Sequence, residues 1–313
     1  MDMSLLFEIL KALLIGVVEG ITEWLPISST GHMILVDEFV QLNVSAEFLK
    51  LFLVVIQIGA ILAVIILYFN KLNPFSRKKT PGQRKGTWRL WGMVVIGCIP
   101  AAVFGFALDD WVGDHFYNAY VVSAMLILYG IIFIVLERRN RRVRGEWESE
   151  LSRPAGRHAK PVAAREEDVD RAMYDVVDVD DIDWKTALKI GFFQVLAIIP
   201  GTSRSGAIII GGMLMKCSRT AAAEFAFFLA IPVMLGWGLV KVVKYVVLGS
   251  LVMTSTEIAV LVVGVVVAFG VSVVAIKFLM GYIKRNDFTA FGWYRIAVGI
   301  VVLGYFLVKA FML

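Results

Sequence analysis

The feature that most constrains this chain is a set of long apolar runs. Ile258–Met280 and Ala290–Leu313 carry little charge, and each has roughly the 20 residues that a helix needs to cross a hydrocarbon core of about 30 Å. Four more runs share this character, namely Phe48–Phe69, Leu90–Leu108, Tyr120–Leu136 and Ala221–Val247. Segments that span lipid must be helices or closed barrels, and these runs do not alternate as strands do. The sequence therefore predicts an all-α polytopic membrane protein with six spanning helices.

The composition supports the membrane bilayer, rather than water, as the surroundings of this chain. Apolar residues make up 59% of the chain and charged residues 18%, whereas soluble domains carry about 25% charged residues. The two cysteines, Cys98 and Cys217, lie far apart in apolar surroundings. Because free cysteines are among the most buried residues, we expect two buried free thiols.

The placement of charge predicts the topology. Asn70–Leu90 contains basic residues and no acidic ones, Leu108–Asn118 contains three aspartates, and Arg138–Arg144 is basic again. Cytoplasmic loops carry the excess of Lys and Arg, so these loops are expected inside, outside and inside in turn, with another inner loop at Lys284 and Arg285. Both termini then lie on the outer side. Since the basic runs flank membrane spans, we expect no nucleic-acid partner.

A polar stretch, Glu137–Trp184, separates residues 1–136 from residues 185–313 within a single transmembrane domain. It begins with arginines and ends with aspartates. It has too few apolar residues to fold independently. We therefore expect a flexible, solvated connector on the cytoplasmic side.

The two halves resemble each other, which predicts an internal repeat. Each half reads as a broken apolar hairpin followed by three spanning helices. Three is an odd number, so the second half must enter the membrane upside down, and such inverted repeats place a site near the bilayer midplane. The hairpins Leu5–Gln41 and Lys185–Lys216 should therefore meet at their tips. Four positions align, namely Gly16 with Gly191, Glu19 with Gln194, Ser28 with Ser203, and Gly31 with Gly206.

The first hairpin contains two acidic residues within an apolar segment. Glu19 and Glu23 are four residues apart and so share one helix face. Buried carboxylates are expensive in a membrane and usually serve function. A structural ion pair with Arg204 is the alternative for these two residues.

The tip of the first hairpin follows at once and has the residue types of an anion site. Pro26 stops the first helix, Ser28, Ser29 and Thr30 supply hydroxyl groups, and a new helix begins beside them. A helix N-terminus presents free N–H groups and attracts phosphate. His32 in the first turn could exchange a proton or attack phosphorus near neutral pH.

The tip of the second hairpin, Pro200–Gly206, repeats this pattern. Its glycines permit unusual backbone angles, and Arg204 offers a planar fork for two phosphate oxygens. An arginine within the membrane needs an anion, which is either the substrate or the carboxylates of the first hairpin. The residues that we assign to substrate binding are Ser28, Thr30, Thr202, Ser203, Arg204, Ser205 and Gly206.

Two motifs carry a resemblance to the undecaprenyl-pyrophosphate phosphatase family, also called the bacitracin-resistance proteins. They are Glu19-Gly-Ile-Thr-Glu23-Trp-Leu-Pro-Ile-Ser-Ser-Thr-Gly-His32 and Pro200-Gly-Thr-Ser-Arg-Ser-Gly206. The resemblance covers the chain outside the connector. It departs from the family at Ile208, where a threonine is common, and in the length of the connector.

The resemblance implies a reaction and its partners. The expected reaction is hydrolysis of a polyisoprenyl pyrophosphate lipid to the monophosphate, with release of phosphate, on the outer face of the bacterial inner membrane. This reaction recycles the cell-wall carrier lipid and depends on a divalent cation, Mg²⁺ or Ca²⁺. A homodimer is compatible with the sequence.

Mapped onto this chain, the resemblance suggests a role for each residue. Arg204 would bind the pyrophosphate, Glu19 and Glu23 would hold the cation or act as general base, and Ser29 or His32 would attack phosphorus. We favour Ser29 as the nucleophile, activated by His32. Charge stabilisation should dominate such phosphoryl transfer.

A second class of function fits part of the same pattern. Inverted repeats and broken helices are typical of transporters, so a transporter or flippase for an anionic lipid is the alternative. Transport alone does not require a hydroxyl–histidine–carboxylate cluster. A structural scaffold explains neither the carboxylates nor the arginine within the membrane hairpins.

Overall fold

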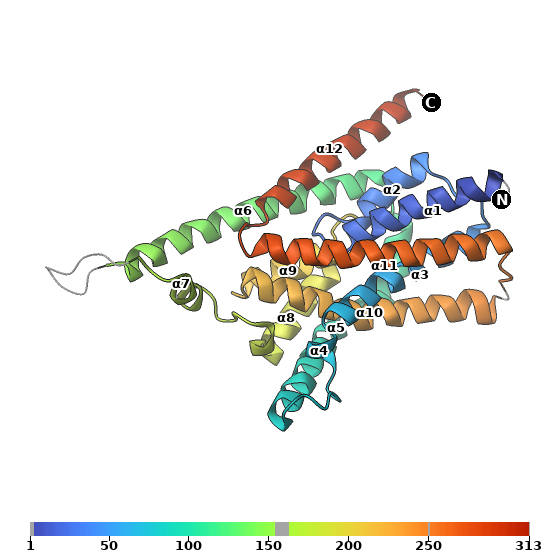
Figure 1. The fold of residues 1–313 in the computed structure, drawn as a ribbon. Coiled ribbons are helices and arrows are strands. Elements are labelled where there is room, and N and C mark those ends of the chain that lie inside the picture. Colours follow the sequence, from blue (N-terminus) through green and yellow to red (C-terminus); the bar gives the residue numbers. More distant parts are fainter. Residues whose placement is uncertain (1–2, 154–162, 250, 313) are drawn as a thin grey trace.

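In a computed structural model, which describes residues 3–153, 163–249 and 251–312, two short helix pairs alternate with sets of long helices (Figure 1). The first half comprises α1 (Met3–Thr22), α2 (Ser29–Phe39), α3 (Ala46–Leu67), α4 (Phe69–Leu72), α5 (Pro81–Phe116) and α6 (Ala119–Leu151). The second half comprises α8 (Trp184–Val195), α9 (Arg204–Leu214), α10 (Arg219–Val242), α11 (Ser255–Ile283) and α12 (Thr289–Met312). Between the halves lies α7 (Glu166–Met173), and single turns occur at Val179–Asp181, Leu196–Ile198 and, as a π-helix, Val243–Leu248.

The predicted fold class is confirmed. Six helices of the described chain are long and apolar enough to cross a membrane, and they are α3, α5, α6, α10, α11 and α12. Each of them contains most or all of one predicted apolar run. The helices of the two hairpins are α1 with α2 and α8 with α9, and they lie outside this set of spans.

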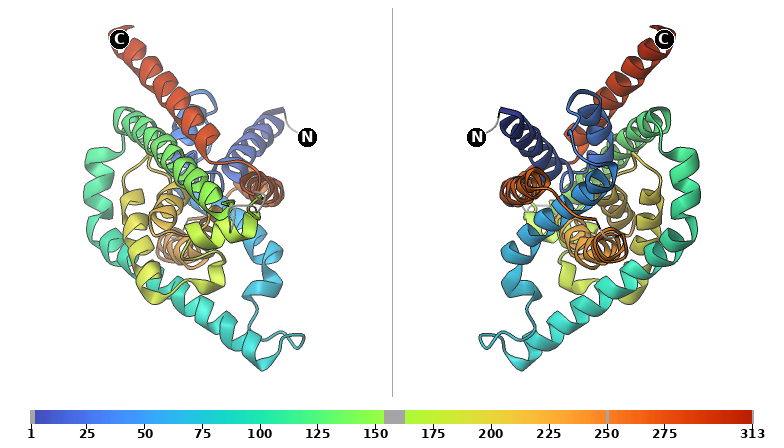
Figure 2. Two further views of the ribbon diagram at one scale, coloured as in Figure 1. Left: turned by 90° about the vertical axis from the view of Figure 1, so that its left-hand side faces the viewer. Right: turned by 90° about the vertical axis from the view of Figure 1, so that its right-hand side faces the viewer.

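The orientation of the two halves agrees with an inverted repeat. Both termini lie toward the right of Figure 1, whereas the far end of α6 and α7, which lead into α8, lie toward the left. The first hairpin therefore enters from one end of the bundle and the second from the other. Figure 2 shows the same helices from the two ends.

The turns at the hairpin tips share one unusual backbone geometry, which supports the repeat alignment. Ser28 has φ 73° and Ser203 has φ 71°, a conformation that few residues other than glycine adopt. Each serine caps the following helix, because its hydroxyl accepts a hydrogen bond from the N–H of Gly31 or Gly206, at 3.4 and 3.1 Å. Two segments with different sequences have thus folded into the same turn.

Close glycine contacts join helix pairs that correspond in the two halves. A Cβ atom at Gly16 of α1 would lie 2.9 Å from the carbonyl oxygen of Gly264 in α11. A Cβ atom at Gly191 of α8 would overlap the carbonyl oxygen of Gly97 in α5. Small residues let membrane helices approach closely and gain van der Waals contact. These glycines therefore hold each re-entrant helix against a spanning helix.

Helix α5 bends along its course, as Figure 2 shows. Pro100 lies within it. A proline inside a helix removes a backbone hydrogen bond and its ring clashes with the preceding turn. The proline accounts for a bend within a continuous helix.

The connector differs from the flexible segment that we expected. Its first part, through Leu151, continues α6 as a helix. A short helix, α7, follows before the second half begins. Glu137 is fully buried and forms two hydrogen bonds with Arg219 of α10, at 2.9 and 2.6 Å. Contact with the bundle, rather than an apolar core of its own, orders this polar segment. Residues 154–162 of the connector lie outside the described residues.

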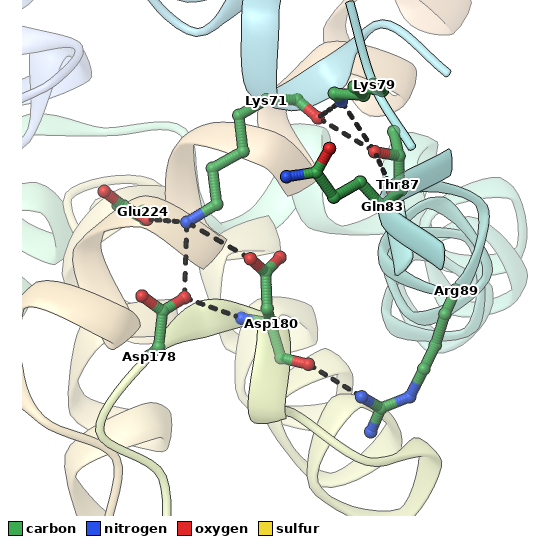
Figure 3. A network of polar contacts seen from close by, with 8 residues as sticks. All are labelled: Lys71, Lys79, Gln83, Thr87, Arg89, Asp178, Asp180 and Glu224. Atoms are coloured by element: carbon green, nitrogen blue, oxygen red, sulfur yellow. Dashed lines mark hydrogen bonds and ion pairs between the residues drawn. The ribbon is translucent and has the colours of Figure 1, made fainter. Parts of the chain in front are cut away.

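The acidic end of the connector is also bound to the bundle rather than simply solvated (Figure 3). Lys71 forms ion pairs with Glu224 at 3.0 Å, Asp178 at 3.3 Å and Asp180 at 3.8 Å. Arg89 of α5 donates to the backbone oxygen of Asp180 at 2.7 Å. This network ties the connector to both halves of the protein.

Both cysteines carry free thiols, as predicted. Cys217 is fully buried beside the connector, and Cys98 is half-buried. Burial raises the pKa of the Cys217 thiol to about 12. A thiol with such a pKa is protonated at neutral pH and is unreactive.

Candidate active site

The tips of the two hairpins meet, as the repeat predicts. Arg204, the first residue of α9, donates a hydrogen bond from Nη2 to Oε1 of Glu23 at 3.0 Å. The Ser205 hydroxyl donates to the backbone oxygens of Glu23 and Leu25, at 3.3 and 3.4 Å. Residues about 180 positions apart in the chain therefore form one polar cluster among apolar helices.

Glu23 is the centre of this cluster. Its side chain is almost completely buried, and its second carboxylate oxygen accepts a hydrogen bond from the Ser29 hydroxyl at 2.8 Å. A carboxylate that accepts the hydroxyl hydrogen is in position to remove it when the serine oxygen attacks. The first hairpin thus contains both a candidate nucleophile and a candidate general base.

Glu19 lies one helical turn before Glu23 and is more deeply buried. Its side chain is only 2% exposed, and its Oε1 has no hydrogen-bond partner among the described residues. A buried oxygen without a partner is unfavourable. In a functional site, such an atom is available to a ligand.

The second hairpin supplies donors for an anion. Nε and Nη1 of Arg204 have no partner among the residues that the structure describes, although the side chain is largely buried. Helices α2 and α9 both begin at this point, and each presents backbone N–H groups at its N-terminus. Free guanidinium donors beside helix N-termini form a binding site for phosphate.

A cavity of about 220 Å³ opens between the two tips. Ligand pockets for small molecules usually measure about 300–1,000 Å³, so this cavity suits a compact polar head rather than a whole lipid. The predicted site residues that line it are Glu23, Ser29, Thr30, Ser203 and Arg204. Helices α3 and α10 close the cavity with Gln57 and Trp237.

Several predicted binding residues shape the turns instead of lining this cavity. Thr202 is fully buried, and its backbone oxygen accepts a hydrogen bond from a buried arginine. The hydroxyl of Ser205 is directed to the backbone of the first hairpin. The side chain of Ser28 and the N–H of Gly206 take part in the caps described above.

His32 lies in the first turn of α2, where the sequence placed it, and its ring has two polar neighbours. Its Nδ1 lies 2.7 Å from the backbone oxygen of Ser28, and its Nε2 lies 2.9 Å from the hydroxyl of Tyr294. Its ring stacks on the Tyr294 ring with the two planes 5° apart. The imidazole thus contacts the helix cap and α12, while the Ser29 hydroxyl bonds to Glu23. Activation of Ser29 by His32 stays a prediction.

The sequence reasoning missed Arg295 of α12. This side chain is completely buried, and its guanidinium donates to the backbone oxygens of Pro26 at 3.0 Å and of Gly201 and Thr202 at 2.9 Å. One residue therefore binds both hairpin turns and holds them together. Its sequence signal was a charged residue inside the apolar run Ala290–Leu313. Ionisable residues within membranes usually have a function.

Gln57 was missed for a similar reason. It lies within the apolar helix α3 and reaches the cavity. A single amide in a spanning helix is a weak signal unless the position of the helix is known.

Together these features define a class of protein. It is a polytopic membrane protein with an inverted repeat, whose two re-entrant hairpins bring a carboxylate, a hydroxyl group and an arginine to one buried cavity. The chain belongs to the family described as bacitracin resistance protein BacA, whose family model matches residues 12–301.

Curated relatives of similar length support this assignment. The chain is 50% identical over 297 residues to the undecaprenyl-diphosphatase of Enterococcus faecalis, which covers 95% of this chain and 97% of that protein. Undecaprenyl-diphosphatases of Streptococcus thermophilus and Desulfitobacterium hafniense are also 50% identical, over 304 and 302 residues. These matches cover 97% and 96% of this chain and 95% and 97% of those proteins.

Proposed function

We infer that this chain is an undecaprenyl-diphosphatase, a membrane hydrolase that converts undecaprenyl pyrophosphate to the monophosphate and inorganic phosphate. The observation that carries this function is the contact of Glu23 with both Ser29 and Arg204 at the rim of one cavity. The relatives bear this name across several bacteria. Recycling of the cell-wall carrier lipid by this reaction is consistent with the bacitracin resistance of the family.

We propose a two-step mechanism that uses the groups of the first hairpin. The Ser29 oxygen attacks the terminal phosphorus while Glu23 accepts the hydroxyl proton. A bond forms between oxygen and phosphorus, and the bond to the bridging oxygen breaks, so undecaprenyl phosphate leaves. Glu23 passes this proton to the departing undecaprenyl phosphate and becomes a carboxylate again. Water then attacks the phosphorus of the phosphoserine while Glu23 accepts the proton of the water. Glu23 returns that proton to the Ser29 oxygen as the bond between serine and phosphorus breaks, and inorganic phosphate departs.

Arg204 stabilises charge in both steps of this proposal. Its two free donors can hold the non-bridging oxygens of the terminal phosphate, because a guanidinium fork matches two oxygen atoms. When substrate binds, the phosphate competes with Glu23 for the arginine. This competition frees the carboxylate to accept the serine proton.

A divalent cation, Mg²⁺ or Ca²⁺, fits the carboxylates of the site. No group of three or more His, Cys, Asp or Glu residues gathers within the described parts of the chain, so phosphate oxygens and water must complete the coordination. Mg²⁺ is often bound in this way, by one or two carboxylates and substrate phosphates. Glu19, with its unpaired oxygen, and Glu23 would hold the ion. When bound, it would neutralise charge on the pyrophosphate.

We further propose that the site opens to the outer face of the bacterial inner membrane. Helix α10 starts at Arg219, beside the connector that the charge pattern assigns to the cytoplasm. Trp237, at the cavity, lies 18 residues further along this helix, which is about 27 Å at 1.5 Å per residue. That distance brings the cavity into the outer part of the membrane.

The function is tested by phosphate release from undecaprenyl pyrophosphate by the purified full chain in detergent. We expect Arg204→Ala and Ser29→Ala to lower kcat by about a hundredfold or more, since loss of one charge-stabilising donor has an effect of that size. Arg77→Ala, which alters an exposed arginine of a cytoplasmic loop, should leave kcat unchanged. Near-normal phosphate release by Arg204→Ala would contradict the site assignment.

Lipid transport is the second candidate, because the structure has the inverted repeat and broken helices that are typical of transporters. The discriminating measurement follows labelled undecaprenyl pyrophosphate in vesicles that contain the protein. Movement of the lipid between leaflets with no phosphate release from wild type would favour transport. Phosphate release that depends on Ser29 would favour hydrolysis.

A further inference from the structure

A second, larger cavity of about 700 Å³ lies at the opposite end of α9 from the catalytic tip. It is enclosed by the cytoplasmic extension of α6, by α7, by the start of α10 and by the loop between α11 and α12. Nothing in the mechanism above uses it. The connector forms one of its walls, so the cavity exists because that polar segment is docked on the bundle.

The walls of this cavity are strongly charged, with more cations than carboxylates. Its cations are Arg141, Arg144, Arg219, Lys284 and Arg285. Its carboxylates are Glu166, Asp170 and Asp287. Two of these cations also pair with carboxylates beside the cavity, Arg219 with Glu137 at 2.6 Å and Arg144 with Glu148 at 3.0 Å. An anionic ligand would therefore be attracted by the cations that have no such partner.

The carboxylates are already neutralised by arginines of the same cavity. Asp287 pairs with Arg141 at 2.6 Å, and Asp170 pairs with Arg144 at 2.9 Å. Glu166 is a second, longer partner of Arg144 at 3.5 Å. The carboxylates therefore do not compete for the remaining cations.

Lys284 and Arg285 are those remaining cations. Neither forms an ion pair with any residue that the structure describes, and both are exposed. They stand at one wall of the cavity, facing the same space as Arg219 and Thr220 of α10. Two free cations at the wall of a preformed cavity can bind a ligand without breaking an existing pair.

The depth of the cavity indicates the kind of anion. The apolar span of α11 ends at Ile283, directly before the two free cations, and the spans of α10 and α12 begin at Arg219 and Thr289. The ends of spanning helices lie at the level of the lipid headgroups. Basic pockets between spanning helices on the cytoplasmic side bind anionic headgroups.

We propose that this cavity is a binding site for a phosphate-bearing anion, with Lys284 and Arg285 as its principal contacts. Two sources share this chemistry, namely the phosphate of an anionic phospholipid in the inner leaflet and inorganic phosphate from the cytoplasm. The site is separate from the catalytic cavity. It does not depend on the proposed hydrolysis.

The test compares two double variants of the full chain, purified in neutral detergent. Lys284→Gln with Arg285→Gln removes the free cations. Arg77→Gln with Lys85→Gln, called the loop variant, removes the same charges from exposed positions before and at the start of α5, away from the cavity. The probes are phosphatidylglycerol and phosphatidylcholine, whose affinities are measured by native mass spectrometry. The third probe is inorganic phosphate, which is measured by the shift in melting temperature.

We expect wild type to bind phosphatidylglycerol more tightly than phosphatidylcholine. The cavity variant should bind phosphatidylglycerol about thirtyfold more weakly, from the attraction of two cations for an anionic surface, whereas the loop variant should change less than about threefold. A melting shift with phosphate that the cavity variant loses, without selective lipid binding, would identify the soluble anion as the ligand. Because phosphate can also occupy the catalytic cavity, only the part of the shift that the cavity variant removes counts.

Equal weakening in both double variants would overturn the proposal, because the effect would then be general surface charge. Retention of both phosphatidylglycerol affinity and the phosphate shift in the cavity variant would also overturn it. Should the double variant fail to fold, Lys284→Gln alone provides the same comparison against Lys85→Gln.

Discussion

Arg295 provides the sharpest test of how the site is held together. We consider Arg295→Met, which keeps an unbranched side chain of similar length but removes the guanidinium. In wild type that group donates three hydrogen bonds of 2.9 to 3.0 Å to the backbone oxygens of Pro26, Gly201 and Thr202. The substitution leaves these three carbonyl groups without this partner, and it also removes a longer contact of 3.5 Å to the backbone oxygen of Met125.

The expected loss of stability follows from these bonds. Hydrogen bonds to charged groups contribute about 1.5–3 kcal/mol each, so the lower value gives roughly 4–5 kcal/mol for three. The substitution also removes a buried charge, so the unfavourable desolvation of that charge is lost and the figure becomes smaller. Breaking a buried charged contact typically lowers stability by about 3–5 kcal/mol net. We therefore expect the free energy of unfolding of Arg295→Met to fall by about 3–4 kcal/mol.

The substitution should also impair catalysis in the molecules that remain folded. Without Arg295 the two turns can shift relative to each other, and a displacement of about 1 Å lowers the rate about a hundredfold. We expect kcat for phosphate release to fall by that factor at a temperature at which the variant is still folded, with a smaller change in KM. Arg295→Lys should recover part of kcat, since an ammonium group can still bind one or two of the carbonyls.

Thermal unfolding and phosphate release in detergent provide both readouts. Lys277→Met is the matched control, because this lysine also lies on a spanning helix but is exposed. The control should retain its melting temperature and its kcat. If Arg295→Met were folded and showed the wild-type kcat, Arg295 would not position the turns, and the reasoning would be refuted.

Two further predictions concern the fold. Gly191→Ala should lower the free energy of unfolding by about 1–3 kcal/mol, because the new methyl group would overlap the backbone of Gly97, whereas Gly270→Ala has open space and should not destabilise the protein in the same thermal assay. Asp183 caps α8 by accepting from the N–H of Thr186 at 2.8 Å. Hydrogen bonds from the Thr186 side chain and from its N–H hold the pKa of Asp183 below its ordinary value. The cap therefore stabilises above pH 4, and its contribution is lost as the pH falls through the lowered pKa. Between pH 6 and pH 3, wild type should lose slightly more melting temperature than Asp183→Ser, whose cap does not titrate; an equal loss would contradict the role of this carboxylate.

The sequence by itself determined the class of the protein and the position of its site in the chain. An apolar run as long as Ile258–Met280 can cross the membrane only as a helix or in a closed barrel, because lipid cannot satisfy backbone hydrogen bonds. The hairpin tips were also predictable, since Pro26 and Gly201 favour turns, and both lie in the turns between the hairpin helices. The alignment of Ser28 with Ser203 was visible in the sequence as a short repeat. In the structure both serines have the same positive-φ backbone conformation.

Tertiary structure alone decided which groups of the site bind to one another. Spacing placed Ser29 and His32 in the same helical turn, yet the serine bonds to Glu23 and the imidazole bonds to Tyr294. Proximity in sequence limits the possible partners of a side chain. The partner of His32, however, is Tyr294 of α12, which lies 262 residues further along the chain.

The same holds for the polar groups outside the motifs. Arg295 binds the oxygen of Pro26 across 269 residues, and no local pattern specifies such a partner. The connector is ordered by Lys71 and Arg219, which belong to other elements. Burial of helical segments depends on their own composition, whereas the pairing of buried polar groups depends on where other segments are placed, because each group needs a partner within about 3 Å.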